Sequence, residues 1–170
     1  ILLGLPILPL ERVQALSTTF RLVNQPVKEF NGQTFRVSPL LTGRTGYDEL
    51  VQDVARVYDE LPPADRAVAG IYATWYMPAG AIDLLGPQYG LPHAVSGSLT
   101  YYLWGPGYSW DVMIIIDNRV NELEVFFEEC ELEMMIQREY DVPIGRPSIY
   151  VCRKPKVSAD TIWNSLKTYR

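Results

Sequence analysis

Histidine and cysteine are scarce in this 170-residue chain, which holds one histidine and two cysteines. Three such residues cannot supply the four Cys and His ligands of a structural zinc site, so that class of protein is excluded. The 15 basic residues are scattered along the chain, and the net charge is −5. Because nucleic-acid binding needs a clustered basic surface, we expect no nucleic-acid partner.

Several catalytic and cofactor motifs are also missing. The chain has no Gly-x-Gly-x-x-Gly, no Gly-Lys-Ser or Gly-Lys-Thr, and no Gly-x-Ser-x-Gly. The single histidine, His93, follows Leu91-Pro92 and is typical of a loop histidine without a nucleophile partner. We therefore expect no catalytic residue, no metal and no cofactor. Asp83, inside an apolar helical segment, is either an exposed helix residue or a buried acid bound to the backbone or to an Arg.

No run of apolar residues reaches the ~20 needed to span a bilayer. Residues 1–10 are nevertheless uncharged and almost wholly apolar, and they contain Pro6 and Pro9, which would end a helix. They lack the basic region and the cleavage site of a signal peptide. We expect residues 1–10 to be the end of a transmembrane helix, residues 11–45 a connector, and residues 46–170 a soluble domain.

Helical and strand patterns alternate from residue 46 onward, which favours an α/β fold. The expectation is a layered α/β/α domain with a small, mainly parallel sheet and room for one antiparallel edge strand. The alternating glutamates of residues 129–136 are typical of a half-exposed strand near an edge. The predicted helices are 46–61, 78–85, 121–127 and 159–169, with Ser158 as N-cap, and the predicted strands are 67–75, 93–96, 111–117, 129–136 and 148–153.

The two cysteines, Cys130 and Cys152, fall in predicted strands. An oxidising compartment would allow one disulfide, but a bond needs Cα atoms about 4.4–6.8 Å apart, and the sequence does not say whether the strands are neighbours. The apolar surroundings of Cys152 favour burial, so the prediction is two free, buried thiols.

The most distinctive pattern is a block of glycines, prolines and aromatic residues in residues 76–107. Such residues suit sugar rings or lipid headgroups, and they serve equally well as packing of loops. The block comprises Ala79–Asp83, Gly86-Pro87, Tyr89–Pro92, Ser96-Gly97 and Leu103–Pro106. Further matching segments are Gly46–Val51, Val54–Tyr58, Leu61–Pro63, Ile149–Lys156 and Trp163.

Together these segments resemble the C-terminal soluble domain of bacterial membrane glycosyltransferases of the family-39-like group. That group is related to the dolichyl-phosphate-mannose protein mannosyltransferases. The resemblance implies sugar transfer from a polyprenyl phosphate by catalytic acids in a membrane part of the same polypeptide, which would be the main partner. It places the soluble domain on the extracytoplasmic face, with an accessory role in capping the active site or in contacting the lipid-linked sugar or the glycan acceptor.

The chain departs from the family pattern at four polar positions. Where the family has two Asn, a Glu and a His, this chain has Trp75, Leu99, Pro78 and Ser98. We therefore predict a largely apolar crevice at the carboxyl ends of the strands. Its candidate binding residues are Trp75, Tyr76, Pro78, Asp83, Ser98, Tyr101, Tyr102 and Trp104.

Two other functions stay open at this point. One is a stand-alone carbohydrate- or lipid-binding α/β module without catalysis, which the aromatic residues beside glycine turns would suit. The other is a stand-alone α/β enzyme, which the missing motifs argue against.

Overall fold

Strand β5 (Val112–Asp117) is buried along its whole length. All six of its residues are buried in the computed structural model, as expected for a strand covered on both faces. The structure describes residues 12, 27–28, 34–35, 45–117, 123–136 and 147–168. The expectation of a membrane-helix end at residues 1–10 lies outside the described residues, as does most of the connector at 11–45.

The chain divides into two units, which are Ile1–Gly46 with Arg138–Gly145, and Tyr47–Gln137 with Arg146–Arg170. The described part of the first unit includes two short strands, β1 (Val27–Lys28) and β2 (Thr34–Phe35), which pair antiparallel.

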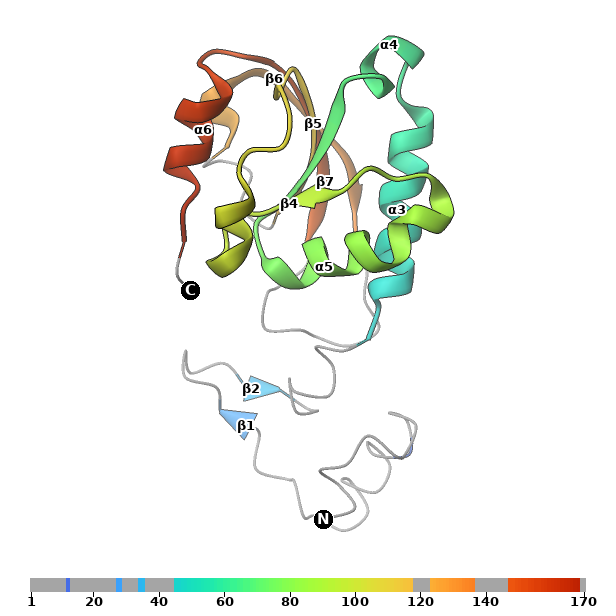
Figure 1. Ribbon diagram of the computed structural model, residues 1–170. Coiled ribbons are helices and arrows are strands. Elements are labelled where there is room, and N and C mark those ends of the chain that lie inside the picture. Colours follow the sequence, from blue (N-terminus) through green and yellow to red (C-terminus); the bar gives the residue numbers. More distant parts are fainter. Residues whose placement is uncertain are drawn as a thin grey trace. The chain divides into compact units, whose positions relative to one another are not determined.

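The second unit is built on a five-stranded sheet with the order β4-β3-β5-β7-β6 (Figure 1). Strands β4, β3 and β5 run parallel, whereas β7 pairs antiparallel with both β5 and β6. The fold class is therefore α/β, as the sequence predicted. The strand that opposes the others is β7, which lies inside the sheet, whereas β6 is the edge strand. Apart from β5, the strands are β3 (Ala69–Ala73), β4 (Ala94–Val95), β6 (Phe127–Met135) and β7 (Ser148–Pro155).

Helices α3 (Tyr47–Glu60) and α5 (Tyr76–Leu85) cover one face of the sheet. Leu50, Val54 and Ile82 from these helices share one core with alternate residues of β3, β5 and β7. The acids in the first turn of α3 complement the positive end of the helix dipole. Pro62 and Pro63 follow α3 and lead into the short helix α4 (Pro63–Arg66).

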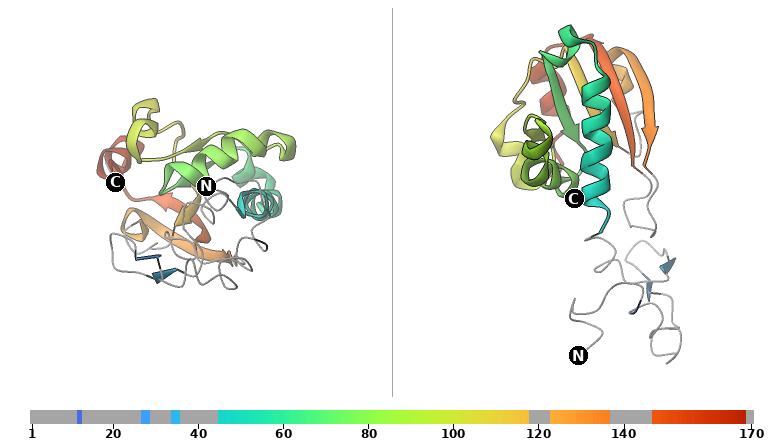
Figure 2. Two further views of the ribbon diagram at one scale, coloured as in Figure 1. Left: turned by 90° about the horizontal axis from the view of Figure 1, so that it is seen from below. Right: turned by 90° about the vertical axis from the view of Figure 1, so that its right-hand side faces the viewer.

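Helix α6 (Ala159–Ser165) covers the other face, so the sheet lies between two helical layers (Figure 2). Trp110 is fully buried there and contacts the rings of Tyr72, Phe127 and Trp163. Ser158 caps α6 by accepting the backbone N–H of Thr161, as predicted.

Two predicted helices are shorter than the sequence indicated. Within 121–127, the described residues form only a 3₁₀ turn, η4 (Glu124–Phe126), because Phe127 already belongs to β6. The closing helix ends at Ser165, and Thr168 beyond it bridges to Ser98, which follows β4. The Thr168 N–H donates to the Gly97 carbonyl, and the Leu99 N–H donates to the Thr168 carbonyl.

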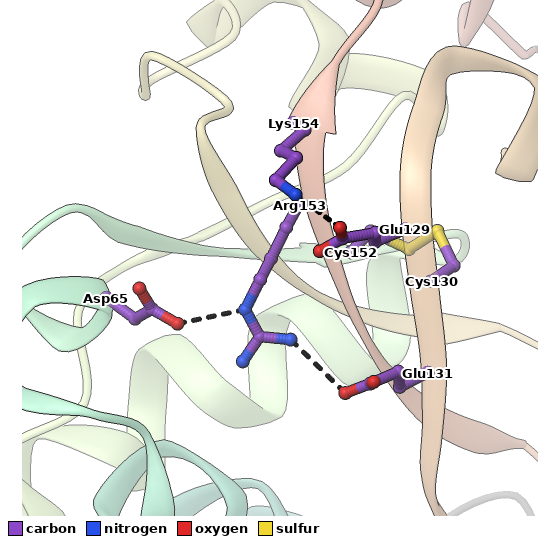
Figure 3. A network of polar contacts seen from close by, with 7 residues as sticks. All are labelled: Asp65, Glu129, Cys130, Glu131, Cys152, Arg153 and Lys154. Carbon is purple, nitrogen blue, oxygen red and sulfur yellow. Dashed lines mark hydrogen bonds and ion pairs between the residues drawn. A yellow bond between two sulfur atoms is a disulfide. The ribbon is translucent and has the colours of Figure 1, made fainter.

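The prediction of free thiols is wrong, because Cys130 and Cys152 form a disulfide (Figure 3). The reason is the register of β6 and β7, which places the two cysteines directly opposite each other with their Cα atoms 4.1 Å apart. Cys152 is buried as predicted, but strand adjacency, which the sequence does not reveal, decides the bonding state.

Candidate functional site

Asp83 is the polar centre of the region that the sequence singled out. It lies near the end of α5, and its side chain is 23% exposed. Its Oδ1 accepts the N–H of Ala94 at 2.8 Å, and its Oδ2 accepts the hydroxyl of Tyr101 at 2.8 Å. Of the two alternatives for Asp83, the structure thus shows the acid bound to the backbone. The carboxylate joins α5 to β4 and to the 3₁₀ helix η2 (Leu99–Trp104).

His93 lies beside this carboxylate, with its Nδ1 3.5 Å from Asp83 Oδ1. The imidazole is 89% exposed, so it faces bulk water rather than an enclosed site. The nearer carboxylate oxygen already binds the Ala94 N–H. The hydroxyl of Tyr108 donates to the His93 carbonyl, which fixes the loop. His93 is therefore a loop histidine, as the sequence indicated.

The two tyrosines around Asp83 hold their phenolic protons tightly. Burial, followed by the hydrogen bond to Asp83 and its negative charge, raises the pKa of Tyr101 well above its ordinary value. Burial, together with the charge of Asp83, raises the pKa of Tyr108 to about 12. Both phenols are therefore neutral hydrogen-bond donors at physiological pH.

The residues predicted to line the crevice make contacts in different parts of the domain. Asp83 and Tyr101 are hydrogen-bonded, and the ring of Trp104 packs 4.4 Å from that of Tyr101. Tyr102 instead faces α6, where its ring stacks on Trp163 at 5.2 Å.

Trp75, Tyr76 and Pro78 form the start of α5. Their helix turn lies up to ~12 Å along the axis from Asp83, since a helix rises about 1.5 Å per residue. Trp75 and Ser98 follow adjacent parallel strands at equivalent positions of the register that pairs Tyr72 with Val95. Ser98 is buried and bridges to Thr168, whereas Tyr76 is exposed.

Sequence reasoning did not foresee the contacts made by α6 and by the end of the chain. Tyr102 donates to the side chain of Asn164 at 3.1 Å, and Lys167 lies 5.0 Å above the Tyr102 ring. Gly97 allows this packing, because a Cβ there would lie 2.0 Å from the carbonyl oxygen of Leu166. No local pattern signals these contacts, since the partners are more than 60 residues apart in the chain.

A second polar cluster surrounds the disulfide on β6 and β7 (Figure 3). Arg153 contacts Asp65 at 2.9 Å and Glu131 at 3.4 Å, and Lys154 contacts Glu129. The hydrogen bond to Glu129 raises the pKa of Lys154. The pairs with Glu129 and Glu131 join β6 to β7, and the pair with Asp65 joins β7 to α4, so the cluster is structural. The exposed pairs with the two glutamates contribute little to stability.

Neither a metal centre nor a membrane span stands out in the described part of the chain. No group of three or more His, Cys, Asp or Glu side chains is arranged there to hold a metal ion. None of the helices described combines the length and the apolar character needed to cross a bilayer.

Comparison of the chain with protein-family models, with curated proteins and with solved structures finds no match of any of the three kinds. The function must therefore be argued from the residues and their geometry.

Proposed function

We propose that this chain is the extracytoplasmic accessory domain of a membrane glycosyltransferase that uses a polyprenyl-phosphate sugar. Its partner would be the membrane catalytic part of the same polypeptide. The domain would cap the active site of that part, or it would help to contact the lipid-linked sugar or the acceptor. The observation that carries the proposal is that the block resembling this family is one continuous unit. Asp83 fastens helix α5 to strand β4 and to η2, and the 3₁₀ helix η1 (Gly86–Tyr89) follows α5 directly.

The chemistry of this unit supports an accessory role rather than catalysis. Both oxygens of Asp83 are occupied by donors from the protein itself. Apart from Thr100, the exposed side chains of η2 are apolar or aromatic, which suits contact with an amphipathic partner rather than proton transfer.

The disulfide supports the extracytoplasmic location. Disulfides persist in the bacterial periplasm and outside the cell, whereas the cytosol keeps thiols reduced. The pairing of Cys130 with Cys152 therefore favours an oxidising compartment.

The encoding gene tests the proposal. Its reading frame upstream of Ile1 should encode roughly eight or more hydrophobic spans of ~20 residues. A frame without such spans would refute the assignment, whatever the domain itself binds.

A second candidate is a stand-alone module that binds carbohydrates or lipids. The exposed ring of Trp104 beside Tyr101 favours it, because such a pair can stack on a sugar ring. Titration with glycans and polyprenyl-phosphate sugars, followed by tryptophan fluorescence, tests this function. No response at millimolar ligand would rule it out.

A further inference from the structure

Residues 84–110 contain no Asp, Glu, Lys or Arg, although such residues make up 21% of the chain. This stretch comprises η1, β4 and η2, and β4 is one edge of the sheet. The opposite edge is β6, where Glu128, Glu129, Glu131 and Glu133 are exposed. The sheet therefore separates an uncharged edge from an acidic edge.

The uncharged edge ends in an apolar tip on η2, formed by Leu99, Leu103 and Trp104. These side chains are 42%, 77% and 69% exposed. Three side chains of one six-residue helix expose far less surface than the ~800 Å² that each partner buries in a stable protein–protein interface. Leucine and tryptophan at a tip are typical instead of side chains that insert at a bilayer surface.

The tip is held in place rather than loosely attached. Tyr101 is anchored to Asp83 and Tyr102 to α6, so the two central rings of η2 are half-buried against the domain. Leu99 adopts a φ of 52°, an uncommon backbone conformation, and its N–H is fixed by the Thr168 carbonyl. With both tyrosines occupied, Leu103 and Trp104 remain for an external partner.

The charges around the tip fit an anionic surface. Lys167, an exposed cation, lies over the ring of Tyr102. Asp83 also contacts η2, but both its oxygens accept hydrogen bonds. An anionic membrane would attract Lys167 and repel the glutamates of β6, which turns η2 toward the lipid.

We propose that η2 docks the domain on an anionic phospholipid bilayer, with Leu103 and Trp104 inserted at the boundary between headgroups and acyl chains. The biological place of this contact rests on the proposed function, in which the domain adjoins a membrane. The contact itself depends only on the surface of this chain.

The test is binding of the full chain to vesicles of phosphatidylcholine that contain phosphatidylglycerol. Leu103→Glu is the test variant, and Val125→Glu is its matched control, since Val125 is 61% exposed beside β6. Residues 1–10 are the same in both variants, so any contribution of theirs to vesicle binding is equal in the two measurements. We expect Leu103→Glu to weaken binding at least about tenfold, the effect of losing one buried leucine, and Val125→Glu to change it little.

Tryptophan fluorescence supplies a second readout. Of the four tryptophans, Trp110 and Trp163 are buried and Trp75 is half-buried at the start of α5. The exposed Trp104 on η2 should therefore give most of the blue shift on binding and be quenched by brominated lipids. Trp104→Phe should keep binding and lose this signal. Leu103→Ser replaces Leu103→Glu as the test variant if Leu103→Glu does not fold.

Equal binding by the Leu103 and Val125 variants would overturn the proposal. So would self-association of the free chain that Leu103→Glu abolishes, since η2 would then join two copies. Neither outcome depends on the upstream gene sequence, so failure here is distinguishable from failure of the proposed function.

Discussion

At the scale of single residues, Asp83 links three segments that the sequence separates. Its two oxygens bind the backbone of Ala94 and the hydroxyl of Tyr101. A carboxylate whose two oxygens both accept hydrogen bonds fixes the positions of the segments around it. The exposed His93 contributes little to this anchoring, because its Nδ1 lies 3.5 Å from the carboxylate, which is long for a hydrogen bond.

Asp83→Ala should destabilise the fold by about 2–3 kcal/mol, because it removes two charge-assisted hydrogen bonds and leaves their donors unpaired. Asp83→Asn should cost less, about 1 kcal/mol, since an amide oxygen can still accept the Ala94 N–H. Urea denaturation measures both values. Equal stability of wild type and Asp83→Ala would contradict the anchoring role.

Tyr108 should make stability fall at high pH. Its pKa in the folded state is about 12, above the ordinary value of 10.0, so folding favours the protonated phenol. This contribution is complete below pH 10 and is lost as pH rises through about 12. Because Tyr108→Phe also removes the hydrogen bond to the His93 carbonyl, wild type should be more stable than this variant at neutral pH. The difference should shrink above pH 10. A difference that stays constant in urea denaturation across this range would contradict the expectation.

At the scale of elements, the β6–β7 pair joins the acidic edge to the rest of the sheet. The strands share a ladder, the disulfide and the ion pairs of Arg153 and Lys154. The exposed ion pairs contribute little, so the covalent bond is the main addition to the ladder.

Replacing both cysteines, Cys130→Ala with Cys152→Ala, should cost about 3 kcal/mol, because the bond closes a loop over a sequence separation of 22. Reductant should lower the urea midpoint of the wild type toward that of the double variant and leave the double variant unchanged. Alkylation of the unfolded wild type without reductant, followed by mass spectrometry, should show no modified cysteine. Two modified cysteines would refute the disulfide.

Local patterns were sufficient to predict most elements of the second unit. The acids and apolar spacing of α3, the apolar run of β5 and the Ser158 cap are read from neighbouring residues. The pairing between strands that are distant in the sequence cannot be read from neighbouring residues, so the sequence does not predict the disulfide between β6 and β7. The candidate site shows the same limit. The tie of Asp83 to the backbone was one of two alternatives, whereas the stacking of Tyr102 on Trp163 depends on tertiary packing.

At the scale of the whole molecule, the sheet carries different chemistry at its two edges. Strand β6 exposes glutamates, and β4 lies in the uncharged stretch of residues 84–110, which includes η2. A domain beside a membrane would gain a preferred orientation from this difference. The disulfide is consistent with the proposed location on the extracytoplasmic side, and the apolar tip with the proposed contact with a membrane.

The location of this domain in the full-length protein tests that account most directly. Alkaline phosphatase folds to activity only outside the cytoplasm, because it needs disulfides. Fused after residue 170, it should be active, and a fluorescent reporter that folds only in the cytoplasm should be dark at the same position. An inactive phosphatase with a bright cytoplasmic reporter would contradict the proposed function.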